Sequence, residues 1–207
     1  MTKNTDKPVR LAGRRRDPKI DDVVLKIALE LFLEQGAAGV NFGQISKRTA
    51  ISRATIYRRW KTRSELLNAM VRSAKIVDEK QADAVLRLST KQFLRFLEDT
   101  IVLALRSPMV PRLVTQLIGT RASHPELLAK YCRDTLEPGW QAVFKAIYGA
   151  RKASFTNAIP DPDLLRDILA GAIVHRLVSR VEPSREAIER KWVKRLMLQI
   201  GLSDRME

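Results

Sequence analysis

The sequence ISRATIYRRW, residues 51–60, places a hydroxyl, a small residue, a phenol and three arginines between large apolar side chains. On a helical wheel of about 100° per residue, Ile56 and Trp60 fall on one side. The opposite side carries small, hydroxylic, phenolic and cationic residues, namely Ala54, Thr55, Tyr57 and Arg58. The pattern predicts a short helix that two apolar residues anchor and whose outer face can contact another molecule.

Start signals for two short helices surround this stretch. Asn41 precedes the segment FGQISKRTA, and a tight turn at residues 49–51 leads to Ser52, which can cap the next helix. Two short helices joined by a turn of about three or four residues form a helix-turn-helix pattern. Its large apolar residues are expected to share one core, made of Leu31, Phe42, Ile45, Ile56 and Trp60.

Longer helices are predicted on both sides of this pattern. The stretch DPKIDDVVLKIALELFLEQG, residues 17–36, offers Asp17 as N-cap, proline at the first helical position and Gly36 as the stop. The sequence TRSE, residues 62–65, is a candidate capping box, whose hydroxyl and carboxylate reciprocally satisfy the first amides of a helix. We expect that helix to run over about residues 64–80.

The rest of the chain predicts further helices and no β-hairpin. Proline-containing breaks separate segments that we place at 85–106, 110–121, 125–150, 162–180 and 184–200. The predicted fold class is all-α with about nine helices, in which a three-helix N-terminal helix-turn-helix domain precedes a larger helical domain. The predicted division is a flexible basic arm at 1–16, the helix-turn-helix domain at 17–63 and the C-terminal domain at 64–207.

Positive charge is concentrated in the first third of the chain. The formal net charge of +15 makes a polyanion the default partner, either nucleic acid or an anionic membrane surface. Residues 1–63 hold 15 of the 38 Lys and Arg but 6 of the 23 Asp and Glu, so this part is the predicted polyanion-binding face. The lone Cys132 excludes an intrachain disulfide. With no apparent signal peptide or membrane span, we expect a cytoplasmic protein without membrane insertion.

The outer face of residues 53–60 suits the major groove of DNA. Arg53, or less readily Arg58, can reach guanine with a bidentate fork, and Thr55 can bond a base edge or touch a thymine methyl. Ala54 permits close approach, and Tyr57 suits a phosphate contact. Arg63 lies in the first turn of the next helix, where amides and the helix dipole favour a phosphate. The alternative interpretation, a solvated charged face, stays open on these residues alone.

From GRRRDPKIDDVVLKIALELFLEQG through ISRATIYRRWKTRSELLNAMV, residues 13–71, the chain resembles the DNA-binding domain of the TetR family of bacterial transcriptional regulators. The resemblance rests on an ordered set: a capped first helix, NFGQIS opening the second, ISRATIYRRW as recognition helix and KTRSELL opening the fourth. It implies DNA contacts at Asn41, Ser52, Arg53, Ala54, Thr55, Tyr57, Arg58, Arg59 and Arg63. Arg59 lies nearer the flank of the wheel, so we expect it to contact a phosphate.

The resemblance also implies a homodimer that binds a double-stranded DNA operator. The chain differs from the common family pattern at two positions and carries a basic arm before the first helix. The family commonly has glycine where Ala50 stands and an aromatic where Ala37 stands, which affects local stability more than DNA contacts. The basic arm resembles extensions that enter a minor groove, through Arg14, Arg15 and Arg16, although a nonspecific phosphate tether fits equally well.

For the C-terminal domain the resemblance implies an inducing small molecule and a dimer interface. Apolar stripes in the last two helices would either pack inside the monomer or form a four-helix interface, and the resemblance favours the interface, from Leu165, Ile168, Leu169, Ala172, Ile173, Leu177, Trp192 and Leu196. A ligand pocket between the middle helices would use Phe93, Phe96, Met109, Tyr131, Trp140 and Phe144, residue types that equally suit a core. The fourth helix is the expected lever from ligand to recognition helix.

Enzymatic and metal chemistry find no support in the sequence. It has no G-x-S-x-G, no phosphate-cradling glycine loop and no H-E-x-x-H. His124 and His175 are far apart, so we expect neither a metal site nor a cofactor. The predicted function is a sequence-specific regulator, a repressor released from a palindromic operator by an inducer. The alternatives are a DNA-binding regulator or architectural protein without an inducer, and a basic helical protein that binds anionic membranes or protein partners.

Overall fold

The computed structural model describes residues 18–74, 84–85, 87–137, 139–141, 144, 161–180 and 184–200. Over these residues the regular elements are nine α-helices and one π-helical turn, in agreement with the predicted all-α class. They are α1 (Pro18–Gly39), α2 (Phe42–Thr49), α3 (Arg53–Arg59), α4 (Arg63–Ser73), α6 (Thr90–Arg106), α7 (Val110–Gly119), α8 (Pro125–Tyr131), η1 (Cys132–Leu136), α10 (Pro162–Val178) and α11 (Glu186–Gln199).

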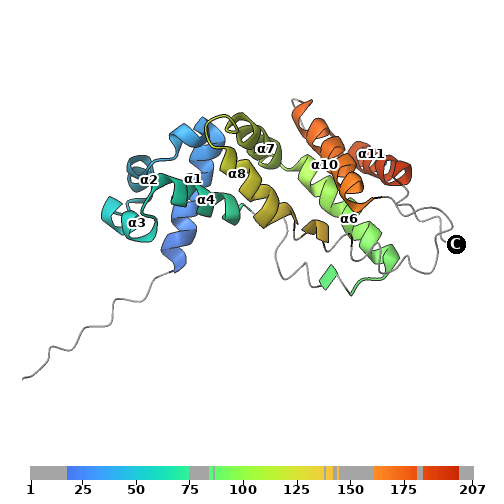
Figure 1. Cartoon of the computed structure of the whole chain (residues 1–207), viewed down its shortest axis with the longest axis horizontal. Coiled ribbons are helices and arrows are strands. Elements are labelled where there is room, and N and C mark those ends of the chain that lie inside the picture. Colours follow the sequence, from blue (N-terminus) through green and yellow to red (C-terminus); the bar gives the residue numbers. More distant parts are fainter. Residues whose placement is uncertain are drawn as a thin grey trace, which may run out of the picture.

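The elements form an elongated molecule (Figure 1). The small helices α2 and α3 lie at one end beside α1 and α4, whereas α6, α10 and α11 lie together at the other end, and α7 and α8 lie between the two groups. The arginines predicted for the N-terminal arm, Arg14, Arg15 and Arg16, lie outside the described residues.

Helix α1 breaks at Gly36 but does not end there. The backbone of Gly36 has φ 67° and ψ −166°, and helical structure resumes to Gly39. A side-chain carbon at Gly36 would lie 3.0 Å from Oε1 of Gln116 on α7. This backbone conformation favours glycine, so the predicted stop is a kink, and α7 packs beside it.

The predicted caps of the helix-turn-helix are confirmed. The side chain of Asn41 accepts a bond from the Gln44 amide at 2.9 Å, and Ser52 Oγ accepts one from the Thr55 amide at 3.2 Å. Asn41 also donates from Nδ2 to the Gly39 carbonyl at 3.4 Å. Both polar groups of Asn41 are therefore engaged in local structure before any partner binds.

One of the two hydrogen bonds of the capping box predicted at residues 62–65 is present, and the other has a different donor. Thr62 Oγ1 accepts a bond from the Glu65 amide at 3.1 Å, as expected. The Glu65 carboxylate accepts from the amide of Lys61 at 2.6 Å, where the reciprocal pattern predicted a bond to the Thr62 amide. The carboxylate thus fixes the loop residue before the cap and stiffens the short link between α3 and α4.

Three predicted helix bounds differ from the structure. Helix α6 begins at Thr90 and not at residue 85, because Ser89 and Gln92 form a capping box that the sequence reading missed. Helix α8 passes into the π-helical turn η1 after Tyr131, inside the segment predicted as one helix. The described part of α4 ends at Ser73, and its predicted continuation past residue 74 lies outside the described residues.

Two hydrophobic clusters hold the elements together. The first joins α1 to α4 and includes Leu113 and Leu117 of α7 with Leu127 and Tyr131 of α8. The second joins α6, α10 and α11. Helix α4, which lies in the predicted C-terminal domain, packs in the first cluster through residues such as Met70. The boundary at 63–64 stays a prediction, and the packing continues across it.

Over the described residues, no single helix has both the length and the apolar composition to cross a membrane. The segments Lys91–Arg106 and Val110–Gly119 meet that test when taken together, with a bend of 73° between them.

Candidate nucleic-acid interface

The recognition helix α3 is anchored as its apolar pattern predicts. Ile56 is fully buried and Trp60 is nearly so, and both belong to the first hydrophobic cluster together with Leu31, Phe42 and Ile45. Fully burying a side chain such as Ile56 stabilises the fold by about 1.5–3 kcal/mol. A helix of seven residues is too short to be stable alone, so this packing holds α3 in place.

Tyr57 extends outward from this core with its ring packed on Phe42. The two ring centroids are 4.2 Å apart with an interplanar angle of 33°. Tyr57 nevertheless remains 47% exposed. The contact fixes the direction of the phenol, and its hydroxyl can donate to a phosphate or a base edge with little loss of side-chain entropy.

Three side chains along α3 form a hydrogen-bonded row. Ser52 Oγ and Thr55 Oγ1 are 2.9 Å apart, and Arg58 donates from Nη2 to Thr55 Oγ1 at 3.1 Å. Ser52 and Arg58 are exposed, whereas Thr55 is half-buried. These bonds orient the hydroxyls and the guanidinium before a partner arrives. Arg53 and Ala54, at the start of α3, are also exposed.

Arg59 points back to the scaffold. Its Nε forms an ion pair with Oδ1 of Asp21 in the first turn of α1, and its side chain is only 11% exposed. The pair joins the end of the recognition helix to the first helix of the domain. The flank position that the wheel gave to Arg59 agrees with this placement, and the phosphate contact expected of it stays a prediction.

Arg63 also binds the protein itself. It donates from Nε to the carbonyl oxygen of Val40 at 2.8 Å and from Nη2 to that of Ala37. Both carbonyls lie where α1 ends, and that of Ala37 also accepts a bond from the Val40 amide at 3.1 Å. The predicted phosphate contact of Arg63 is untested, but two of its donors already hold the corner between α1 and α2.

A further arginine, which the sequence reading did not single out, ties α2 to α1. Arg48 binds Glu34 through both guanidinium ends, at 2.7 Å and 3.2 Å. The hydrogen bonds from Arg48 hold the pKa of the Glu34 carboxyl below its ordinary value. Residues 34 and 48 are far apart in sequence, so no local spacing rule could have paired them.

The six residues predicted to form a ligand pocket do not all come together. Five of them belong to the second hydrophobic cluster: Phe93, Phe96, Met109, Trp140 and Phe144. The rings of Trp140 and Phe144 stack with centroids 6.1 Å apart. Tyr131 packs instead in the first cluster, where it is 3% exposed and burial raises the pKa of its hydroxyl to about 12. Tyr131 thus lies apart from the other five residues, and the pocket itself stays a prediction.

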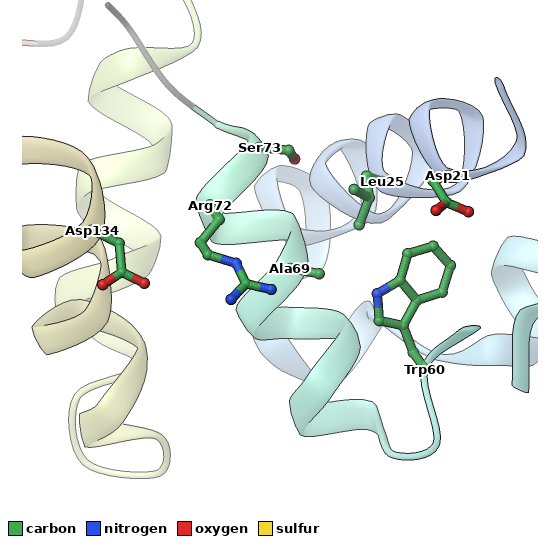
Figure 2. Close-up of a pocket in the computed structure, with 7 residues that line it drawn as sticks. All are labelled: Asp21, Leu25, Trp60, Ala69, Arg72, Ser73 and Asp134. Carbon is green, nitrogen blue, oxygen red and sulfur yellow. The ribbon is translucent and has the colours of Figure 1, made fainter. Parts of the chain in front are cut away.

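Two cavities lined by described residues lie elsewhere. One of about 550 Å³ opens between α1, α4 and η1 (Figure 2). Figure 2 shows Trp60 beside α1 and α4, with Arg72 on α4 and Asp134 on the neighbouring helical segment. The other, of about 980 Å³, lies along α6 and α11 and is lined by Arg95 and Lys194 among others. Neither is lined by the six residues predicted for the ligand.

The predicted dimer residues fall mostly on the inner side of α10 and α11. Buried in the second cluster are Leu165, Leu169 and Leu177, with Ala172, Ile173, Trp192 and Leu196 half-buried. Of the predicted set, Ile168 is the residue with a large exposed fraction, 44%. Both sides of α10 are apolar, and the sequence stripe followed the side that faces the monomer core. The exposed apolar residues of these two helices include Leu164, Ile168, Val178 and Ile188, and the predicted interface itself stays a prediction.

Among the described residues, no group of three or more His, Cys, Asp or Glu is placed to hold a metal ion.

Several solved structures share this architecture. A TetR-family transcriptional regulator from Mesorhizobium loti superposes with a TM-score of 0.65 at 15% identity, over 90% of this chain and 98% of that one. A TetR transcriptional regulator from Agrobacterium tumefaciens gives a TM-score of 0.60 at 22% identity, over 88% and 94%. A transcriptional regulator from Streptomyces coelicolor gives 0.55 at 16% identity, over 86% and 98%. At these identities the likeness establishes a shared fold.

No curated protein matches the chain. The family model of bacterial regulatory proteins of the tetR family matches residues 24–70, which run from α1 through the recognition helix into α4. This match covers the DNA-binding unit described above, and the fold of the solved regulators extends over the C-terminal helices. Residues 24–70 therefore form a DNA-binding domain of the tetR family of bacterial regulatory proteins.

Proposed function

We propose that this regulator acts as a homodimeric repressor that reads a palindromic operator through α3 and leaves it when a small molecule binds. The observation that carries the proposal is the ordered outer face of α3. Hydrogen bonds link Ser52, Thr55 and Arg58 along it, and Tyr57 is fixed on Phe42. Such a face suits base edges and phosphates because its donors are aligned in the free protein.

The proposed DNA contacts follow from this placement. Thr55, Tyr57 and Arg58 face the bases, with Ser52 and Ala54 allowing the backbone to approach closely. Asn41, Arg53, Arg59 and Arg63 complete the expected set, and Arg14, Arg15 and Arg16 extend it along the backbone. A bidentate arginine contact to a base contributes about 1–3 kcal/mol of discrimination. Phosphate contacts contribute affinity that falls with salt.

The proposed dimer rests on the outer side of α10. Exposed residues recur there at heptad spacing, at Leu164, Ile168, Gly171, His175 and Val178. Spacings of four and three residues are those of helices that pack nearly antiparallel in a bundle. A dimer that reads two half-sites needs its two α3 helices about 34–36 Å apart, the spacing of successive major grooves.

The proposed inducer route runs through α7. Arg112 of α7 donates from Nη2 to the Leu33 carbonyl at 3.2 Å, and Gln116 lies against the kink at Gly36. A ligand among the aromatic side chains of the second cluster would shift α7 and with it the end of α1. In this proposal α7 transmits the change to α1, in addition to the transmission through α4 that the sequence predicts. A regulator without an inducer is the second candidate, and the aromatic packing of that cluster supports it.

Selection of bound sequences from a random DNA pool tests the proposal, because a dimer selects a palindrome. The variants Thr55→Ala and Tyr57→Ala should lose sequence preference while keeping fold and dimer. Tyr57→Phe keeps the ring on Phe42 and removes only the hydroxyl, so it should lose preference as Tyr57→Ala does if the hydroxyl makes the contact. Unchanged preference in both alanine variants would contradict the assignment of α3 as the reading helix.

A further inference from the structure

Gly43, in the first turn of α2, lies under the guanidinium of Arg53. A side-chain carbon built on Gly43 would be 3.0 Å from Nη2 of Arg53 and 3.5 Å from its Cζ. It would also be 3.3 Å from Oδ1 of Asn41, the cap of α2. A side chain at position 43 would therefore be in tight contact with the guanidinium, which would have to shift by a few tenths of an ångström from its present place.

The backbone of Gly43 does not itself require glycine. Among the described residues, positive φ occurs at Gly36 and Ala50, and Gly43 has helical geometry within α2. Glycine inside a helix lowers its stability relative to alanine. Gly43 is unfavourable for the helix and its backbone does not require glycine. We therefore relate the glycine to the space beside it, which the guanidinium of Arg53 occupies.

The positive charge of Arg53 is not neutralised within the described part of the protein. Among the described residues, Arg53 forms no ion pair or hydrogen bond with an acidic side chain. Its cation is placed near the start of α2, the end at which the helix dipole is also positive. Two positive features that meet on an exposed surface are stabilised by an anion between them.

We propose that Gly43 is a positioning residue for Arg53, and that it seats the guanidinium at the start of α2 where it binds a DNA phosphate and not a guanine edge. The proposal rests on the DNA-binding function proposed above. An arginine folded back toward α2 has its reach directed away from the outer face of α3. Base reading then falls to Thr55, Tyr57 and Arg58, and Arg53 sets the height and tilt of the helix on the duplex.

The test compares Gly43→Ala, Arg53→Ala and the double variant, with Gly119→Ala as the matched control. Gly119 lies at the end of α7, and a side-chain carbon there would meet nothing within 4 Å. The probe is a 24-base-pair duplex of mixed sequence, with affinity measured by fluorescence anisotropy over a series of salt concentrations. Melting temperatures of all variants are measured in parallel, and Gly43→Ala is expected to melt no lower than wild type.

Arg53→Ala is expected to weaken binding to every sequence and to reduce the salt slope by about 0.9, the value for one phosphate. Gly43→Ala should weaken binding several-fold in the same uniform way and should change nothing further in the Arg53→Ala background. Gly119→Ala should bind as wild type does. Base preferences selected from a random pool should be the same for wild type, Gly43→Ala and Arg53→Ala.

Three results would overturn the assignment. Relaxed preference at one base pair in Arg53→Ala would make this arginine a base reader. An equal loss from Gly43→Ala with and without Arg53 would mean that the new methyl group touches DNA directly. Wild-type affinity in Gly43→Ala would show that the seat is irrelevant. By contrast, a wild-type protein that binds no duplex at all would contradict the proposed function as a whole.

Discussion

Arg63 donates a hydrogen bond from Nε to the carbonyl oxygen of Val40 at 2.8 Å, and so links the start of α4 to the corner between α1 and α2. Its Nη2 binds the Ala37 carbonyl in the same corner. From the other side, Arg112 of α7 binds the Leu33 carbonyl at 3.2 Å. Two arginines from different helices thus hold the end of α1, next to the kink at Gly36.

Arg63→Ala is expected to lower the free energy of unfolding by about 1.5–3 kcal/mol, because charge-assisted bonds to two carbonyls are lost. Arg63→Lys should restore little of it, since an ammonium cannot reproduce the two-pronged geometry. Urea unfolding measures both. Arg72→Ala, on the exposed side of the same helix, is the control and should change the stability by less than about 0.5 kcal/mol.

The same variants separate the two roles of Arg63 in DNA binding. If its work is to hold the corner, Arg63→Ala changes stability while the salt slope of binding to a mixed duplex stays as in wild type. A slope reduced by about 0.9, with unfolding unchanged, would instead establish a phosphate contact and contradict the structural role.

Ala50 adopts a left-handed conformation at the end of α2, with φ 58° and ψ 9°. The turn is supported by Thr49, whose Oγ1 donates to the Ile45 carbonyl at 2.8 Å and accepts from the Ile51 amide at 3.2 Å. This geometry carries a cost of about 1–2 kcal/mol for a residue with a side chain. The strain expected from the departure from glycine is therefore located at this turn.

Ala50→Gly is expected to raise the free energy of unfolding by about 0.5–1 kcal/mol, since the relief of strain exceeds the added freedom of the unfolded chain. Thermal or urea unfolding measures the change. Ala129→Gly provides a control of opposite sign, because Ala129 is exposed inside α8 and its replacement should cost about 0.5–1 kcal/mol. Loss of stability in Ala50→Gly would mean that the left-handed turn carries no strain.

Local signals allowed the helix-turn-helix to be predicted, and long-range contacts account for what was missed. The caps at Asn41 and Ser52 depend on residues within three positions, so the sequence reveals them. The partners of Arg59 and Arg63 lie 38 and 23 or more residues away, and a basic residue on a wheel does not disclose which of several acceptors it meets. Both arginines therefore looked free to bind a phosphate.

The buried side of helix α10 could not be predicted from the sequence, for a different reason. Leu165 and Leu169 are buried, while Leu164 and Ile168 beside them are exposed, so apolar residues occur on both sides of the same helix. Periodicity identifies a buried face only when the other face is polar. The sequence thus predicted an apolar helix near an interface, and the structure was needed to decide which side faces outward.

Ile168→Glu is expected to convert the proposed dimer into a monomer, because it places a charge in the centre of the exposed stripe of α10. The exposed position allows the fold of the monomer to tolerate the change. Analytical ultracentrifugation measures the molecular mass. Leu103→Glu is the matched control, since Leu103 on α6 is 64% exposed and lies off the stripe. Dissociation by both variants, or by neither, would contradict an interface along α10.

Glu189 is 1% exposed and joins α11 to the end of α10. Its carboxylate accepts bonds of 2.6 Å from Nε of Arg176 and of 2.6 Å from Nη1 of Arg180. The guanidinium of Arg176 also lies 4.3 Å from the ring centroid of Trp192. Burial acts to raise the pKa of Glu189, but the hydrogen bonds from Arg176 and Ser184 outweigh it, and the pKa is lowered.

A lowered pKa in the folded state means that the carboxylate stabilises the fold at every pH above the unfolded pKa of about 4.3. This contribution is lost as the pH falls through the folded pKa, so the free energy of unfolding of the wild type should decline below about pH 4.5. Glu189→Gln should lower the free energy of unfolding by about 3 kcal/mol at pH 7, the lower end for a broken buried pair, because Arg180 is 34% exposed and can be solvated. It should also make the free energy of unfolding less dependent on pH below about pH 4.5.

The control is Glu186→Gln, at an exposed carboxyl paired with Arg106. It should change the free energy of unfolding by less than about 1 kcal/mol and leave its decline at low pH in place. An equal effect of the two substitutions, measured by urea unfolding from pH 3 to 7 at one protein concentration, would contradict a special role for the buried carboxylate.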